Sequence, residues 1–341
     1  MDFRTTMTDQ MGGAAWGVYG HDWAVAHLRK GIAHRRVRHA YLIVGPESVG
    51  KETLARAFAM TLNCERSNPD ERPCGECRAC RLIAAGTHPD LLFSELDAAT
   101  GALKIEEIRT VTGRLALKPF EARYRVAILR DFDRAQPRAQ DALLKTLEEP
   151  PSYALLLLLA RSGDALLSTI TSRSQVLSLR PVSAGLVRDA LVEHWGADPD
   201  RATLLARLCA GRIGWAVRAL SEPALLEQRG AALDLLDEIV GQNRAGRFAV
   251  AEDLGRDKLS LVPLLELWQT YWRDLVLLCE GSRLAPSNYD RAAKLERLAD
   301  QLTGDAALAA LTSTAETINL LQYNLNVRLA LETLFLSYPG L

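Results

Sequence analysis

Short, continuous apolar runs dominate the first half of the chain. Each is only four or five residues long, which is too short for a helix and suits strands buried on both faces of a parallel sheet. The runs are Ala40–Val44, Leu91–Ser94, Val126–Leu129, Leu155–Leu159 and Val176–Leu179. Polar or helically spaced stretches separate them. We therefore predict an α/β domain in which a parallel sheet is covered by helices on both faces.

Helical periodicity replaces these runs in the second half. Between about 182 and 243 the apolar stretches are short and are broken at Gly196, Gly211 and Pro223, which favours a small helical lid. From about 244 onward only helical spacing remains, and Leu261–Cys279 carries an apolar face too wide for an isolated helix. We predict three domains: a nucleotide-fold domain at 1–181, a lid at 182–243 and a C-terminal helical domain at 244–341.

A phosphate-binding sequence follows the first predicted strand. Residues 45–52 read Gly-Pro-Glu-Ser-Val-Gly-Lys-Glu and lead into a helix predicted over Lys51–Asn63. Gly45 and Gly50 permit a turn whose backbone N–H groups face a triphosphate, and Lys51 could reach the terminal phosphates. Glu52, however, occupies the position where a Ser or Thr hydroxyl binds Mg²⁺. The sequence therefore predicts a degenerate P-loop that leaves ATP binding open but not hydrolysis.

The second metal position is also altered. A nucleotide-hydrolysing relative carries an Asp for Mg²⁺ at the end of a later strand. Here the strand predicted at Arg125–Leu129 is followed by Arg130. A guanidinium cannot bind Mg²⁺ and could at most pair with Glu52 or with a phosphate. Because two independent parts of the machinery are missing, we expect no ATP hydrolysis.

Four of the six cysteines lie close together. Cys64, Cys74, Cys77 and Cys80 give the spacing C-x₉-C-x₂-C-x₂-C within a polar, Pro- and Gly-containing stretch. Four thiolates at this spacing close a tetrahedral shell around structural Zn²⁺ and leave no position for catalysis. A disulfide framework is the alternative, but residues 1–20 show no apolar signal segment. We predict a zinc insert over 64–80 and a cytoplasmic location.

Two further motifs make the sequence recognisable. Residues 143–151 read Leu-Leu-Lys-Thr-Leu-Glu-Glu-Pro-Pro, and Ser172-Arg173-Ser174 follows one more predicted strand. With the P-loop and the cysteines, in this order, they resemble the subunits of the bacterial sliding-clamp loader of DNA polymerase III, of the AAA+ class. His88-Pro89-Asp90 and Lys118-Pro119-Phe120 also match. Glu52, Arg130 and the segment 211–214, where a motor subunit has a second sensor arginine, favour a non-hydrolysing subunit over the motor.

The resemblance implies a fold and a role. The fold would be an AAA+ P-loop sheet domain, a helical lid and a helical collar that joins five subunits. The role would be to help load the sliding clamp onto primed DNA, without covalent chemistry at its own site. Arg173, flanked by Ser172 and Ser174, would be an arginine finger acting in trans. The implied partners are the motor (gamma/tau) and delta subunits, with the clamp and the primer–template DNA reached through the complex.

Composition agrees with this interpretation and leaves two alternatives open. The chain has 341 residues, 48% of them hydrophobic, and a net charge of −1, which argues against a general nucleic-acid coat. The longest apolar run, Ala154–Ala160, is too short for a bilayer, so no membrane partner is expected. The alternatives are a motor subunit that binds or slowly hydrolyses ATP, and a free-standing, zinc-containing AAA+ protein that binds DNA.

Overall fold

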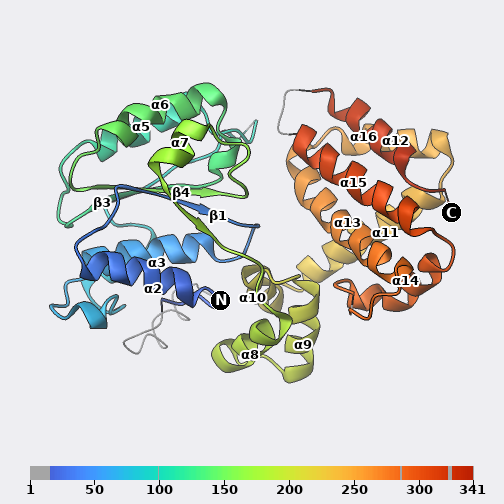
Figure 1. Cartoon of the computed structure of the whole chain (residues 1–341), viewed down its shortest axis with the longest axis horizontal. Coiled ribbons are helices and arrows are strands. Elements are labelled where there is room, and N and C mark those ends of the chain that lie inside the picture. Colours follow the sequence, from blue (N-terminus) through green and yellow to red (C-terminus); the bar gives the residue numbers. More distant parts are fainter. Residues whose placement is uncertain (1–15, 99, 285, 322–324, 341) are drawn as a thin grey trace. The chain divides into compact units, whose positions relative to one another are not determined.

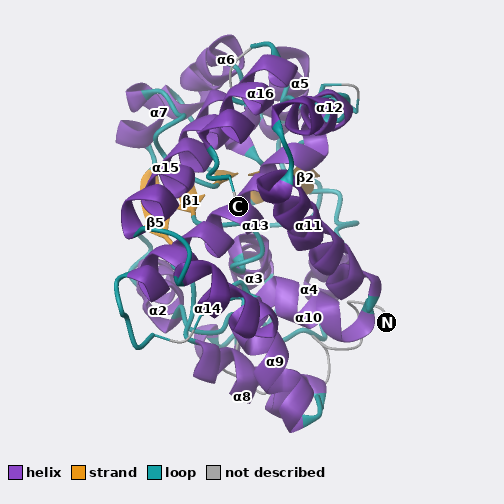
Figure 2. Ribbon diagram, turned by 90° about the vertical axis from the view of Figure 1, so that its right-hand side faces the viewer, coloured by secondary structure: helices purple, strands orange, loops and turns teal. Residues whose placement is uncertain are grey.

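The chain folds into two compact units. The computed structural model describes residues 16–98, 100–284, 286–321 and 325–340. The first unit ends at Ala206 and also includes Gly211–Val217, whereas the second consists of Arg207–Ala210 and the residues from Arg218 onward (Figure 1). All strands of the described residues, orange in Figure 2, belong to the first unit.

The first unit is built on a five-stranded parallel sheet with the strand order β2-β3-β4-β1-β5. The strands are β1 (Ala40–Val44), β2 (Leu91–Phe93), β3 (Arg125–Leu129), β4 (Ala154–Ala160) and β5 (Gln175–Ser178). Each coincides with a predicted run to within one residue or so at either end. The predicted parallel sheet is therefore confirmed. The continuous apolar runs arise because the central strands are buried on both faces.

Helices cover both faces of the sheet (Figure 1). Alternate side chains of one strand enter different cores: Tyr41 and Ile43 pack on one face, and Leu42 packs on the other. Helices α2 (Asp22–Ala33), α3 (Lys51–Asn63) and α4 (Arg78–Ala85) cover the first face. Helices α5 (Ile105–Leu115), α6 (Pro137–Glu148) and α7 (Ser168–Arg173) cover the second.

The remainder of the chain is helical, as predicted. Helices α8 (Ala184–Trp195), α9 (Pro199–Leu208) and α10 (Ile213–Ser221) follow the sheet. The later helices are α11 (Ala224–Gly241), α12 (Arg244–Leu254), α13 (Lys258–Cys279), α14 (Ala292–Ala299), α15 (Gly304–Leu320) and α16 (Val327–Ser337). The helices from α11 onward share one hydrophobic core. It includes the buried side chains of Trp268, Trp272 and Phe335, and Leu233 of α11. The domain limits at 181 and 243 stay a prediction.

Two of the shorter matching motifs have a structural explanation. Asp90 is buried, and its carboxylate accepts backbone N–H groups from Phe120, Glu121 and Ala122 at 2.7, 2.9 and 3.0 Å. The His-Pro-Asp segment therefore holds the Lys-Pro-Phe loop that leads into β3. As a check on membrane association, none of the helices in the described ranges is both long and apolar enough to cross a bilayer.

Candidate nucleotide site, cysteine cluster and exposed arginine

The P-loop lies between β1 and α3, as predicted. Gly45 has φ +153°, and a Cβ there would come within 2.5 Å of the Leu179 carbonyl oxygen; Gly50 has φ +109°. Both positions therefore require glycine. Lys51 Nζ donates hydrogen bonds to the carbonyl oxygens of Gly45 at 2.6 Å and Pro46 at 2.8 Å. The ammonium that would contact phosphates is thus turned back onto its own loop.

Glu52 and Arg130 form a bidentate ion pair. Arg130 Nε lies 2.9 Å from Glu52 Oε2, and an Arg130 terminal nitrogen lies 2.5 Å from Oε1. Arg56, one turn along α3, donates to the same carboxylate at 2.8 Å. The guanidiniums of Arg56 and Arg130 lie 4.7 and 4.2 Å from the ring centroid of Phe93. The sequence left two partners open for Arg130, Glu52 or a phosphate, and in the structure it pairs with Glu52.

The electrostatics of the loop follow from these contacts. Partial burial raises the pKa of Glu52, but the hydrogen bonds and charge of Arg130, and then those of Arg56, outweigh it, so the pKa lies below its ordinary value. Burial lowers the pKa of Lys51, although the carboxylates of Asp133 and Asp131 act in the opposite direction. The carboxylate at the altered metal position is therefore charged and already neutralised by arginines.

Helix α10 begins directly against the P-loop. The Gly214 N–H donates to the Ser48 carbonyl oxygen at 2.8 Å, and a Cβ on Gly214 would lie 2.9 Å from that oxygen. Gly211, just before the helix, has φ +79° and no room for a side chain beside Val182. The segment 211–214 therefore packs its backbone directly against the loop.

The four cysteines converge as their spacing predicts. Their sulfur atoms all lie within 4.8 Å of one another, slightly wider than the roughly 3.8 Å between thiolates around tetrahedral zinc with Zn–S bonds of about 2.3 Å. Cys77 N–H points to Cys74 Sγ at 3.3 Å, and Cys80 N–H points to Cys77 Sγ at 3.4 Å. None of the cysteines is in a disulfide. The donor set fits a closed, structural Zn²⁺ site.

Arg173 is the last residue of α7, and its side chain is 37% exposed. One terminal nitrogen lies 2.8 Å from Glu148 Oε1, and the other donates to the Thr169 carbonyl oxygen at 3.2 Å. Ser172 is exposed, whereas the Ser174 hydroxyl is buried without a hydrogen-bond partner among the described residues. Neither the P-loop nor the cysteine cluster is among the described contacts of Arg173.

Comparison with known proteins assigns the chain to a family. A family model described as "DNA polymerase III, delta subunit" matches residues 20–183. Over 236 residues the chain is 31% identical to the DNA polymerase III subunit delta′ of Pseudomonas aeruginosa, covering 69% of this chain and 70% of that one. The chain belongs to the delta′ family of DNA polymerase III subunits. The resemblance to clamp-loader subunits is thereby confirmed.

Other relatives show how far the similarity extends. The delta′ subunit of Bacillus subtilis is 26% identical over 313 residues, which cover 91% of this chain and 93% of that one. The tau subunit of Escherichia coli is 34% identical over 201 residues, but these cover 58% of this chain and 31% of tau. The chain thus spans less than a third of the length of that tau subunit. Its similarity to the two delta′ proteins, in contrast, extends over most of this chain.

Sequence reasoning missed two contacts of this delta′ family member. The return of Lys51 to the Gly45 and Pro46 carbonyls has no signal in the side-chain pattern. The pairing of Arg173 with Glu148 joins two motifs that were noted separately. A hint in the sequence was the acidic residue Glu148 shortly before Pro150 and Pro151, where a helix would end and a basic residue is usual.

The ion pair predicts a pH-dependent effect of Glu52→Gln. At neutral pH this change should lower the free energy of unfolding by about 1 kcal/mol or less, as expected for a partly exposed pair. Because the folded-state pKa is depressed, the stabilisation is present above the unfolded pKa of about 4.3 and is lost as pH falls through the folded-state pKa. Denaturant titrations from about pH 7 to about pH 3 should therefore show the difference closing.

Glu106→Gln is the matched control, because Glu106 is an exposed carboxylate in the first turn of α5 with no ion pair among the described contacts. Both carboxylates lie in the first turn of a helix, so Glu106→Gln measures the loss that the helix dipole alone causes, and the loss for Glu52→Gln should be larger. A difference for Glu52→Gln that stayed constant down to pH 3 would contradict the ion-pair account.

The cysteine cluster predicts about one zinc per chain, the stoichiometry of a four-ligand site, in protein purified without chelator. Cys77→Ser should lower the zinc content, while Cys279→Ser, outside the cluster, should leave it unchanged. Elemental analysis measures the metal. Hydrogen exchange should then show the loss of protection in 64–85 and not in the sheet, because the insert is peripheral to the strands. Cysteines found in disulfides without zinc would overturn the assignment.

Proposed function

We propose that the chain is a non-hydrolysing subunit of the DNA polymerase III clamp loader, the complex that opens the sliding clamp and places it on primed DNA. The observation that carries the proposal is the Glu52–Arg130 pair at the two positions where a hydrolysing relative holds Mg²⁺. Family membership in delta′ supports the assignment to the complex.

The pair opposes metal-dependent hydrolysis in two ways. Both oxygens of Glu52 already accept hydrogen bonds from arginines, whose positive charge beside the carboxylate opposes the binding of Mg²⁺. Arg130 places a positive charge where the metal would sit, and like charges repel. Binding of a nucleotide would also require Lys51 to leave two carbonyl oxygens. Weak binding of ATP stays compatible with this geometry, but turnover does not.

A role in trans is proposed for Arg173. In ring ATPases of this class, the nucleotide lies at a subunit interface and an arginine of the neighbour stabilises the transferring phosphoryl group. The half-exposed guanidinium at the end of α7 supports such a role. The neighbour would be a motor (gamma/tau) subunit, delta would complete the ring, and contacts with clamp and primer–template DNA would be made through the complex.

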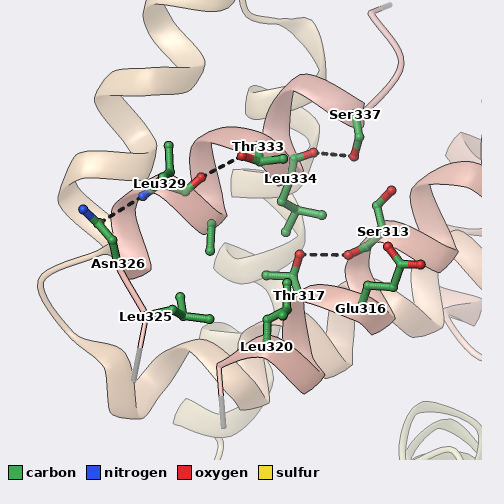
Figure 3. A pocket seen from close by; sticks show the side chains of 11 residues that line it. Ser313, Glu316, Thr317, Leu320, Leu325, Asn326, Leu329, Thr333, Leu334 and Ser337 are labelled. Carbon is green, nitrogen blue, oxygen red and sulfur yellow. Dashed lines mark hydrogen bonds between the residues drawn. The ribbon is translucent and has the colours of Figure 1, made fainter. Parts of the chain in front are cut away.

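The C-terminal helices are proposed to form the collar. Between α15 and α16 lies a groove of about 340 Å³ whose lining includes Leu320 and Leu329 (Figure 3). The hydroxyls of Thr317, Thr333 and Ser337 on this groove donate to carbonyls of their own helices. Their hydroxyls are thus satisfied, and the groove, which Glu316 and Asn326 also line, keeps a largely apolar surface that fits the collar helices of a neighbouring subunit.

Two alternatives are distinguishable. The 34% identity to tau favours a motor subunit that still hydrolyses ATP, and the zinc-type cluster is compatible with a free-standing DNA-binding AAA+ protein. Gel filtration with the motor and delta subunits distinguishes the proposed role from the free-standing protein, because only the clamp-loader role requires a stable hetero-oligomer. ATPase assays distinguish the proposed role from a motor subunit that still hydrolyses ATP.

The altered metal positions predict no Mg²⁺-dependent phosphate release by the purified chain above background. The reason is that neither Glu52 nor Arg130 can hold the ion. Steady-state phosphate assays with and without clamp and DNA measure it, with a motor subunit as the positive control. Hydrolysis at the rate of that control, abolished by Lys51→Ala, would show that the chain is a motor.

The trans role predicts that Arg173→Ala lowers the ATPase of the reconstituted complex in the presence of clamp and DNA. Arginine fingers contribute about 10³–10⁵ in rate in GTPases, and a ring with several sites should lose less overall because one interface is affected. Arg188→Ala is the matched control, since Arg188 is also half-exposed and held in a surface ion pair. Normal assembly with wild-type ATPase and clamp loading would reduce the role to scaffolding.

A further inference from the structure

The arginine at the end of α7 is held by an acid at the end of α6. Glu148 is the last residue of α6, and its Oε1 lies 2.8 Å from a terminal nitrogen of Arg173, the last residue of α7. Both side chains are partly exposed, 51% for Glu148 and 37% for Arg173. The pair therefore joins two helix ends at the surface of the first unit.

The position of Glu148 is not explained by helix stability. The C-terminal end of a helix carries a partial negative charge, so an acidic residue there is unfavourable and a basic residue is the usual choice. Pro150 and Pro151 follow directly and end the helix. Arg173 is the cation that compensates Glu148 in the described part of the chain. This acid thus has its favourable interaction outside its own helix.

Glu148 and the Thr169 carbonyl group hold the Arg173 guanidinium in place but use only part of its hydrogen-bonding capacity. A guanidinium has five N–H donors, of which one points to Glu148 and one to the Thr169 carbonyl oxygen. The other three donors have no acceptor among the described residues, and two of them are enough for bidentate binding of phosphate oxygens. A side chain held from one side in this way loses less rotamer freedom when it meets its target.

The beginning of α7 is attached to the same helix. Gln140 of α6 is buried, and its side-chain amide donates to the Ala165 carbonyl oxygen at 3.2 Å and accepts the Leu167 N–H at 2.8 Å. Ile170, in the middle of α7, is fully buried. Helix α6 therefore holds α7 at its start through Gln140 and its last side chain through Glu148.

We propose that Glu148 is a positioning residue for Arg173, which holds the guanidinium in the orientation in which it meets the phosphates bound to the neighbouring subunit. The proposal rests on the trans role of Arg173 described above. Glu148 itself touches no nucleotide. Its removal should therefore affect how efficiently the finger acts and not how tightly the neighbour binds ATP.

The test is a clamp-loader complex reconstituted with full-length Glu148→Gln, which keeps the size of the side chain and removes its charge. The clamp- and DNA-stimulated kcat should fall about two- to fivefold, the range that a partly exposed ion pair can supply, while KM for ATP and assembly stay unchanged. Glu149→Gln is the matched control, because Glu149 is the adjacent exposed acid and has no ion pair among the described contacts. It should behave as wild type.

A double-mutant cycle identifies the pathway of the effect. If Glu148 acts only through Arg173, then Glu148→Gln should add no further loss to Arg173→Ala. An additional loss in that background would assign Glu148 to the fold and overturn the proposal. So would a Glu148→Gln complex that matches Glu149→Gln, or one that is faster than wild type, and in these cases the trans role of Arg173 would stand. An Arg173→Ala complex with full activity would overturn both.

Discussion

The ion pair between Glu52 and Arg130 determines the charge and the hydrogen bonding at the altered metal positions beside the P-loop. Glu52 lies in the first turn of α3, which follows β1, and Arg130 follows β3, with β4 between these two strands in the sheet. Each residue alone is unsuited to a Mg²⁺-phosphate site. Together they neutralise each other at short distance, and Phe93 covers the arginine. The altered site is thus a stable arrangement in its own right and not simply one that has lost two ligands.

If the chain is non-hydrolysing as proposed, this pairing means that a change of one residue alone would not create a Mg²⁺ site. Replacing only Arg130 by Asp would place two carboxylates next to each other and beside the phosphates, which repels both. Replacing only Glu52 by Thr would leave Arg130 as a cation in the metal position, so that phosphates could bind without Mg²⁺. Only the combined change restores the ligands. The physical coupling of the two positions explains why both differ from a motor subunit together.

The glycines of the P-loop are retained for reasons of packing. Gly45 lies against the Leu179 carbonyl, and Gly214 brings α10 against the Ser48 carbonyl. These contacts are made within the protein, so the glycines are needed for the fold whether or not the loop binds a nucleotide. A P-loop motif in a sequence therefore indicates the strand-loop-helix geometry more reliably than it indicates hydrolysis.

The sequence predicted those features that depend on local pattern. The strands and α3 were found because buried parallel strands are continuous apolar runs, and the cysteine cluster was found because its spacing is local. The Glu52–Arg130 pair could be named only as one option, since 78 residues separate the partners. The contact of Arg173 with Glu148, like the return of Lys51 to its own loop, depends on how helix ends and carbonyl groups are oriented in the folded chain. Periodicity and spacing carry no information on that orientation.

The same contacts show how the two parts of the proposed function, no hydrolysis in cis and a role in trans, could coexist in one chain. The residues that alter the nucleotide site belong to α3 and to the end of β3, whereas α7 is fixed by Gln140, Ile170 and the end of α6. No described contact of Arg173 involves Glu52 or Arg130. Changes at the chain's own metal positions can therefore accumulate without moving the exposed arginine. The two parts of the proposed function, no hydrolysis in cis and an arginine acting in trans, therefore rest on physically independent sets of contacts.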